Sequence, residues 1–285
     1  MSRRAVPLSW AGLALGIGGV IVAITGHSVT AVAAAAPHGK LVWSDEFDGK
    51  AGSLPDSSKW TMETGGDGWG NHELESYTNR PENVQQRNGN LVITARQEPF
   101  TGVDKIQRDY TSARLQTKGH FAQAYGRFEA RMQLPSGKGI WPAFWLLADN
   151  VDTAHWPACG EIDVLETIGD PHVMYSTLHG PGYSGGKAIS AKFPLPAGQA
   201  VDDGFHIYAV EWTPERIRFF FDDQLIVQRT PKDLPTGAPW VYDHPFFILL
   251  NLAVGGDWPG NPNQQTVFPQ RLLVDYVRVY DNRVY

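Results

Sequence analysis

Cysteine is almost absent from this chain of 285 residues. Cys159 is the single cysteine, so an intramolecular disulfide and a cysteine-rich metal site are both excluded. Cys159 directly precedes an apolar segment that carries three acids. We expect it to be a small buried hydrophobic residue rather than a nucleophile.

Runs of Lys and Arg, internal repeats and long amphipathic helical periods are also missing. The formal charge is −6, and an acidic surface without a basic patch argues against a nucleic-acid partner. The absence of a blade-length repeat argues against a propeller. Instead, 30 glycines and 20 prolines separate short strand-like segments, which favours an all-β protein.

Acidic residues are missing before residue 45, and this N-terminal part has the composition of a signal peptide. A basic start (MSRR), an apolar run (AGLALGIGGVIVAI) and small residues (AVAAAA) follow one another. We predict a signal peptide over residues 1–36, secretion from a bacterium, and one domain over 37–285. Loss of the leader changes the formal charge from −6 to −8. The alternative is a retained membrane anchor, because the run from Pro7 to Ile24 is nearly long enough to span a bilayer.

Alternation of apolar and polar residues recurs along the chain, as expected for half-buried strands. In GRFEARMQL (126–134) every second residue from Phe128 to Leu134 is apolar, and Asp222-Asp223 lies between two strand-like segments, which predicts a hairpin. The other strand-like segments are LVWS (41–44), LVITAR (91–96), VMYSTLH (173–179), HIYAVEW (206–212), RIRFFF (216–221), LIVQR (225–229), FFILLNLAV (246–254) and LLVDYVRVY (272–280). The pattern predicts an all-β, antiparallel two-sheet sandwich rather than a barrel.

The segment GEIDVLETIG carries three acids at spacings that a regular strand cannot place on one face. Glu161 and Asp163 share a face, whereas Glu166 lies an odd number of residues from Glu161 and would point the other way. A β-bulge that adds Val164 or Leu165 as an extra residue would bring Glu166 to the same face.

With such a bulge, the Cα atoms of Glu161 and Glu166 would be ~13 Å apart at ~3.3 Å per residue. Side chains that each reach ~4 Å would leave about 5 Å between the carboxyl groups. Retaining glycoside hydrolysis uses two carboxyl groups roughly 5–5.5 Å apart, and Asp163 between them would help to keep a proton on the acid. A solvated acidic face and a Ca²⁺ site remain as alternatives, although Ca²⁺ sites usually come from loops.

GEIDVLE, together with WPAFWLL (141–147), resembles glycoside hydrolase family 16 and, within it, the laminarinase-like endo-β-1,3-glucanases. The resemblance covers nearly the whole chain after the leader, in the blocks SDEFDG (44–49), GWGNHELESYT (68–78), NGNLVITA (88–95), SARLQTKG (112–119), YGRFEARMQLPSGKGIWPAFWLL (125–147), STLHGPGYSGG (176–186), NLAVGGDWPG (251–260) and VDYVRVY (274–280). It implies a concanavalin A-like β-jelly-roll sandwich with an open substrate cleft on the concave sheet, and a catalytic domain over 37–285.

The resemblance also implies a mechanism and a partner. Glu161 would be the nucleophile, Asp163 the helper and Glu166 the acid/base of a double displacement that cleaves internal β-1,3-glucosidic bonds of laminarin-like glucans. No cofactor is implied for catalysis. We expect a monomer without stable membrane association after leader cleavage. Alternatives are a β-1,3-1,4-glucanase, another family 16 polysaccharide hydrolase (agarases and carrageenases share ExDxxE), or a non-catalytic glucan-binding module.

Aromatic residues make up 12% of the chain, with ten tryptophans, and flat rings can stack on sugar faces. Trp141 and Trp145 share a face in either a strand or a helix, and Trp258 lies among Gly and Pro, which predicts a loop. Core packing is the alternative for the tryptophans and for a histidine beside the acids, and a structural role is the alternative for the other polar residues. With the resemblance, the residues predicted to bind substrate are Asn71, Arg114, Trp141, Trp145, His179 and Trp258.

A calcium site is the last feature that the resemblance implies. Family members often hold one Ca²⁺ away from the catalytic residues, and the matching positions are Glu46, the Gly89 carbonyl and Asp275. Asp275 lies in an otherwise apolar strand, where an unpaired charge would be costly. It therefore needs a partner, and Ca²⁺ and a salt bridge are the two candidates.

Overall fold

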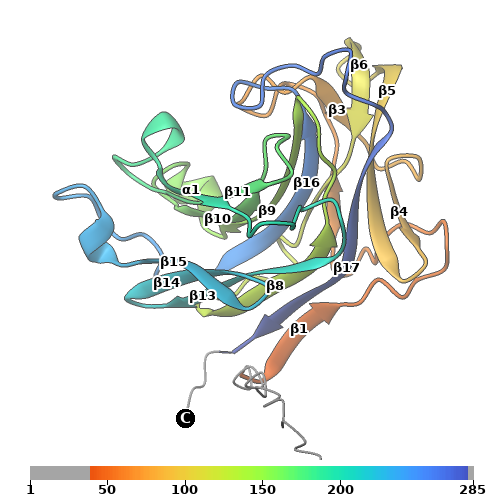
Figure 1. The fold of residues 1–285 in the computed structure, drawn as a ribbon. Helices are drawn as coiled ribbons and strands as arrows, with labels where there is room; N and C mark the ends of the chain where they lie inside the picture. Colours follow the sequence, from red (N-terminus) through yellow and green to blue (C-terminus); the bar gives the residue numbers. More distant parts are fainter. Residues whose placement is uncertain (1–38, 282–285) are drawn as a thin grey trace, which may run out of the picture. The chain divides into compact units, whose positions relative to one another are not determined.

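Two stacked β-sheets make up the part of the chain that the computed structural model describes, residues 39–281 (Figure 1). The predicted signal peptide, residues 1–36, lies outside the described residues. Within 39–281, no helix has the length and apolar character needed to cross a bilayer.

The first sheet has ten strands in the order β15-β14-β13-β8-β17-β5-β6-β3, with β1 paired to β17 and β4 paired to β5. Its strands are β1 (Leu41–Asp45), β3 (Glu75–Tyr77), β4 (Val84–Arg87), β5 (Asn90–Thr101), β6 (Gln107–Ser112), β8 (Gly126–Gln133), β13 (His206–Thr213), β14 (Arg216–Phe221), β15 (Gln224–Arg229) and β17 (Gln270–Tyr280). The last strand of the chain, β17, lies between β8 and β5 in the interior of this sheet.

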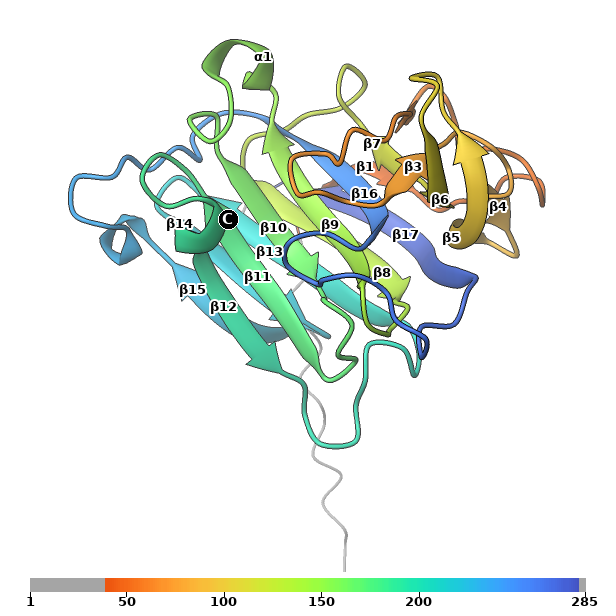
Figure 2. The same cartoon turned by 90° about the horizontal axis from the view of Figure 1, so that it is seen from above.

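The second sheet has seven strands in the order β12-β11-β10-β9-β16-β7-β2, and Figure 2 shows β9, β10 and β11 side by side in it. Its strands are β2 (Thr61–Glu63), β7 (Arg114–Gln116), β9 (Ile140–Ala148), β10 (Glu161–Glu166), β11 (Val173–His179), β12 (Ile189–Pro194) and β16 (Phe246–Val254). Helical turns are short: α1 (Val151–Ala154) and the 3₁₀ turns η1 (Gly185–Lys187) and η2 (Pro231–Asp233).

The hydrophobic core lies between the sheets, because alternation turns one face of each strand inward. On β8, Phe128 and Met132 are fully buried, as the sequence predicts. The opposite face of β8 is also covered, since Arg127 and Glu129 form a buried ion pair with a 2.7 Å contact. Strand β16 is buried at all its positions. The second sheet is therefore anchored to the core along β16, the neighbour of β9.

The predicted strands all form, and the antiparallel sandwich is confirmed. Asp222 and Asp223 have φ values of 46° and 62° and connect β14 to β15, as two-residue hairpin turns with positive φ do. The exception to antiparallel pairing is β3 with β6, which run parallel. That pair forms the edge of the first sheet nearest β7 and β16.

Candidate active site

The three acids of β10 belong to one face because the strand is bulged. Its pairing with β9 shifts between Asp163 and Leu165, which leaves Val164 as the extra residue. The pairing with β11 shifts between Asp163 and Glu166. Val164 and Leu165 are both buried in the core, so the acids on either side of them, Glu161 included, point away from it. The bulge predicted from parity is confirmed.

Glu166 lies deep in the site and accepts a hydrogen bond from the indole of Trp141, with a distance of 3.0 Å between Nε1 and Oε1. The residue is only 8% exposed. Burial, together with the negative charge of Asp163, raises the pKa of Glu166 well above its usual value. Glu166 therefore retains a proton at neutral pH, which is what a general acid must do.

Glu161 lies at the other end of the bulge and is held by a different indole. Trp156 Nε1 donates to Glu161 Oε2 over 2.9 Å, and His179 Nε2 lies 3.8 Å from the other carboxylate oxygen, Oε1. Burial and the charge of Asp163 raise the pKa of Glu161 to about 8, while His179 lowers it. An indole donor and His179 favour the anion of both acids. Glu161 is partly exposed whereas Glu166 is buried, so burial opposes the ionisation of Glu161 less, and Glu161 is the group that ionises first.

His179 connects the acids to the backbone of a neighbouring loop. The Gly185 N–H donates to His179 Nδ1 over 3.2 Å, which assigns the proton of a neutral ring to Nε2. Nε2 lies 3.0 Å from Asp163 Oδ2, and that buried oxygen has no hydrogen-bond partner among the described residues. Burial raises the pKa of Asp163 to about 7. The prediction that His179 lies beside the acids is confirmed in position.

Glu161, Asp163 and His179 form the cluster, within the described residues, that could hold a metal ion. One ligand atom each from Glu161, Asp163 and His179 lie within 4.8 Å of one another. Because the carboxyl groups lie so close together, they titrate as a coupled set and retain protons at neutral pH. The cluster of acids is therefore suited to acid–base chemistry without a metal ion.

Trp141 and Trp145 occupy alternate positions of β9 and point to the side that carries the acids. Trp145 is opposite Asp163 in the ladder and donates from Nε1 to Asn251 Oδ1 over 2.8 Å. Trp258 lies outside the strands and is 41% exposed, and its ring meets that of Trp141 edge to face at 5.7 Å. The predicted loop position of Trp258 is confirmed, and neither β9 tryptophan belongs to the buried core.

Arg114 and Asn71 reach the same face from the far side of β16. The Arg114 guanidinium lies 4.8 Å from the ring centroids of both Trp69 and Trp145 and pairs with Glu63. Asn71 is exposed, and its backbone oxygen lies 3.1 Å from where a Cβ on Gly256 would be, a glycine that also faces the Trp141 ring. The structure thus brings all six predicted substrate-binding residues to the side of the sheet that carries the acids.

A second set of contacts holds this part of the site in place. Glu73 accepts hydrogen bonds from Asn71 Nδ2 at 3.3 Å and from the Tyr77 hydroxyl at 2.8 Å. Tyr77 in turn accepts from Asn251 Nδ2 at 3.1 Å, and Asn251 holds Trp145. A continuous chain of hydrogen bonds therefore links Asn71 to Trp145 through buried groups.

Sequence reasoning missed Trp156, Asn251, Glu73 and Tyr77. Asn251 did carry a signal, since it is the one polar residue in FFILLNLAV. Glu73 and Tyr77 lie in the block HELESYT, and nothing in that block indicates that its side chains contact Asn71 or Asn251. Trp156 lies in a loop and has no periodic neighbour, so nothing in the local pattern identified it.

The predicted calcium ligands lie elsewhere, and both carboxylates have guanidinium partners. Arg278 donates to both oxygens of Glu46, at 3.0 and 2.8 Å, and this contact lowers the pKa of Glu46. Arg131 lies 2.7 Å from Asp275 Oδ2. Gly89 occupies the turn between β4 and β5 with φ 71°. Of the two partners considered for Asp275, the structure shows the salt bridge.

Cys159 is fully buried, as predicted. Burial and the nearby charge of Glu161 raise the pKa of its thiol to about 11. A thiol of such high pKa stays protonated, so Cys159 is not a nucleophile at neutral pH.

The site combines a carboxyl group that holds a proton with one that ionises more easily, and indole rings that are open to solvent flank them. This combination suits the cleavage of a glycosidic bond better than any other common reaction. The class that fold and site define is therefore a β-sandwich glycoside hydrolase. Sequence comparison makes the class specific: the family model described as Glycosyl hydrolases family 16 matches residues 71–278. The chain belongs to this family.

Three relatives illustrate the match. A protein named Beta-glucanase from Rhodothermus marinus is 46% identical over 257 residues, which are 86% of each chain. The laminarinase catalytic domain from Thermotoga maritima superposes with a TM-score of 0.81 at 45% identity, covering 86% of this chain and 99% of that one. The laminarinase from Rhodothermus marinus gives 0.78 at 45% identity, covering 86% and 98%. The predicted family and jelly-roll fold are confirmed.

Proposed function

We propose that this protein is a retaining endo-β-1,3-glucanase that hydrolyses laminarin-like glucans. The observation that carries the proposal is the bulge of β10, which puts Glu161, Asp163 and Glu166 on one face of the second sheet. Family membership and the similarity to laminarinases support β-1,3-glucan as substrate.

In the first step, Glu166 gives its proton to the glycosidic oxygen while a carboxylate oxygen of Glu161 attacks the anomeric carbon. The bond between that carbon and the glycosidic oxygen breaks, so the departing chain leaves with a new hydroxyl group. The other fragment remains as an ester on Glu161. The hydrogen bond from Trp156 to Glu161 supports this role, because it favours the anion that attacks.

In the second step, Glu166, now ionised, takes a proton from a water molecule that attacks the anomeric carbon. The ester bond to Glu161 breaks, and the product has the configuration of the substrate. Asp163 and His179 influence the ionisation of the two main acids. The negative charge of Asp163 favours the proton on Glu166 before the first step, and His179 lowers the pKa of Glu161.

Sugar binding is assigned to the exposed rings and polar groups around the acids. Trp258 and Trp156 are 41% and 47% exposed and lie on the Glu166 and Glu161 sides respectively. Trp141 and Trp145 line the floor between them, and Arg114 and Asn71 offer donors to sugar hydroxyls. The position of Trp258 and Trp156 at opposite ends of the acid row supports an open, endo-acting site that a chain can cross.

The proposal includes a location and an oligomeric state. We infer from the N-terminal composition that the protein is exported, and we expect it to act as a monomer outside the cell. N-terminal sequencing of secreted material should give a first residue between 33 and 40, and material that retains the leader would contradict this part.

A structural Ca²⁺ at Glu46, the Gly89 carbonyl and Asp275 is suggested by the family resemblance. The residues as arranged do not fit the ion, because Arg278 and Arg131 already neutralise both carboxylates. A calcium site here would require both guanidinium groups to move. Thermal unfolding in CaCl₂ and in EGTA decides the point: a higher Tm with calcium supports the site, and equal values reject it.

One experiment tests substrate and catalysis together. The purified protein is incubated with laminarin, curdlan, lichenan and agarose, and the products are separated by size. Laminarin and curdlan oligosaccharides support the proposal, whereas fragments from lichenan or agarose alone would move the substrate to mixed-linkage glucan or galactan. Binding to laminarin without any product would leave a glucan-binding module.

Azide rescue assigns the two acids. Glu161→Ala with azide and an activated β-glucoside should give the inverted glycosyl azide, because the nucleophile is missing. Glu166→Ala should give the retained azide, because Glu161 still forms the ester. The same anomer from both variants would contradict the assignment.

A further inference from the structure

A pocket of about 410 Å³ lies beyond the edge of the candidate active site, where β3 and the tip of the β5–β6 hairpin face each other. Residues 64–65, 76–80, 100–103 and 105 line it. Its volume is within the range of small-molecule sites. None of the residues assigned to catalysis or sugar binding above is part of the lining.

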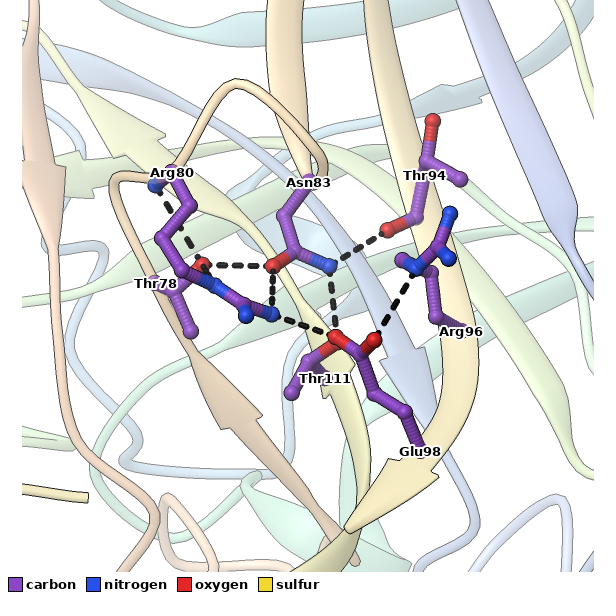
Figure 3. A network of polar contacts seen from close by, with 7 residues as sticks. All are labelled: Thr78, Arg80, Asn83, Thr94, Arg96, Glu98 and Thr111. Atoms are coloured by element: carbon purple, nitrogen blue, oxygen red, sulfur yellow. Dashed lines mark hydrogen bonds and ion pairs between the residues drawn. The ribbon is translucent and has the colours of Figure 1, made fainter. Parts of the chain in front are cut away.

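The walls of the pocket are held rigidly by a polar network, which Figure 3 shows. The guanidinium group of Arg80 lies 4.5 Å from the ring centroid of Phe100, donates to Asn83 Oδ1 over 2.8 Å and pairs with Glu98. Asn83 is itself fully buried and donates to Thr111 Oγ1 over 2.9 Å. A pre-ordered wall loses little entropy when a ligand binds.

One buried hydroxyl in the lining has no partner. Ser76 is 1% exposed, and its Oγ makes no hydrogen bond to any described residue. It lies near Gly102 on the opposite hairpin, 3.8 Å from where a Cβ on that residue would be. Buried polar groups normally have hydrogen-bond partners, so a hydroxyl that faces a pocket is suited to a ligand with hydroxyl groups of its own.

The pocket is physically continuous with the candidate active site through Tyr77. Tyr77 lines the pocket, its ring packs on Trp69 with a centroid distance of 5.2 Å, and Arg114 bridges Trp69 and Trp145. The Tyr77 hydroxyl also reaches the buried amide of Asn251. Figure 2 shows β3 and β6 beyond β16, on the side away from β11. A chain that crosses the acids and continues past Trp145 would run toward the side of the molecule that carries this pocket.

The chemistry of the lining favours a neutral, hydroxyl-rich ligand. Aromatic rings (Tyr77 and Phe100) alternate with hydroxyl and amide side chains, and Arg80 pairs with Glu98, which Arg96 also contacts. The hairpin tip also exposes Val103 by 81%, an apolar side chain available to pack against the face of a sugar ring. Lys105, at the exposed hairpin tip, adds one positive charge at the rim of the pocket.

We propose that this pocket is a distal subsite for the same glucan chain, binding glucosyl units remote from the bond that is cleaved. The inference rests on the proposed function, since it assumes a glucan that extends across the acids. It adds a length dependence that the catalytic residues alone do not give: short oligosaccharides do not reach the pocket, and long ones do.

The test uses the inactive variant Glu161→Ala, so that binding is measured without cleavage. Ser76→Ala, and separately the pair Asn79→Ala with Thr101→Ala, are added to it, and Kd values are measured by calorimetry for laminarin oligosaccharides from trisaccharide to octasaccharide. We expect Kd to rise three- to tenfold for the longest sugars and to stay unchanged for the trisaccharide. Gln228→Ala, an exposed residue on β15, is the control and should change neither.

The outcomes separate this inference from the function on which it rests. Equal loss for short and long sugars, or no loss for any, overturns the distal subsite while laminarin cleavage by the unmodified protein stands. If the unmodified protein neither binds nor cleaves β-1,3-glucan, the proposed function itself fails. Thermal unfolding of each variant confirms that the fold is intact, and the exposed pair Asn79 and Thr101 keeps the test available if Ser76→Ala is unstable.

Discussion

The indole N–H of Trp156 donates to a carboxylate oxygen of Glu161 over 2.9 Å, from a loop in which the ring is 47% exposed. Trp141 does the same for Glu166 from the neighbouring strand. Each acid of the pair is thus held by one indole, and the two indoles differ in exposure and in origin. The difference allows the two acids to be perturbed separately.

Replacement of Trp156 by Phe should move the acidic limb of the pH–rate profile to higher pH. Glu161 must be ionised to attack, and loss of a donor to the anion raises its pKa. A hydrogen bond to a charged group is worth ~1.5–3 kcal/mol, and exposure reduces this, so we expect a shift of roughly one pH unit. The measurement is kcat/KM on laminarin between pH 4 and pH 9.

Trp240→Phe is the matched control, because the Trp240 N–H has no hydrogen-bond partner among the described residues. It should leave the acidic limb in place. An unchanged limb in Trp156→Phe would show that the indole does not influence the ionisation of Glu161.

Deletion of Val164 should leave a folded protein with measurable activity. Without the extra residue, Glu161, Asp163 and Glu166 share a face by simple alternation, and Leu165 remains directed to the core. Deletion of Ile162 instead reverses the parity of Glu161 relative to the other two acids and should abolish hydrolysis. Laminarin hydrolysis and Tm are measured for both, and equal inactivity of two folded variants would contradict the role given to the bulge.

Trp258→Ala should weaken glucan binding without unfolding the protein, because the ring lies in a loop and is 41% exposed. Loss of one stacking surface should cost ~1–3 kcal/mol of binding free energy, measured as Kd in the Glu161→Ala background. Trp60→Ala is the contrast, since Trp60 is 1% exposed and its loss should lower the Tm strongly. A Trp258 variant that unfolds while its folded fraction binds normally would make the residue structural.

Glu75→Gln should make the protein relatively more stable as pH rises. Glu75 is fully buried, and burial, followed by the charge of Glu73, raises its pKa well above 4.5. The folded state therefore retains a proton that the unfolded state loses above about pH 4.5, so stability is full below that pH and falls as pH rises through the folded-state pKa. The Gln side chain lacks this dependence.

Tm is measured for the wild type and Glu75→Gln between pH 5 and pH 8. The difference in favour of the variant should grow with pH, and parallel curves would falsify the prediction. Glu82→Gln, at an exposed position, should follow the wild type throughout.

The row of acids could be derived from the sequence because it depends on local geometry. Strand parity relates residues five positions apart, and the conflict between Glu161 and Glu166 required a bulge whatever the rest of the fold was. The hairpin at Asp222-Asp223 followed from similarly short-range rules. Long β-strands with one apolar face were predicted for the same reason.

Contacts between distant segments could not be derived in this way. Glu73 meets Asn251 through Tyr77 only because β3 comes to lie beside β16, and no pattern in either segment encodes that arrangement. The partners of Glu46 and Asp275 raise the same difficulty, since Arg278 is 232 residues from Glu46 along the chain. Parallel pairing of β3 with β6 was likewise invisible, because strand composition does not specify direction.

The position of β17 has a consequence for how the protein is made. This strand is the last element of the described residues, yet it lies between β8 and β5 and also pairs with β1. The ten-stranded sheet therefore cannot be completed until β17 has been synthesised, and before that β8 and β5 present unpaired edges. Such edges invite pairing with other chains, so a chain that ends before Gln270 should aggregate rather than fold into a smaller sandwich.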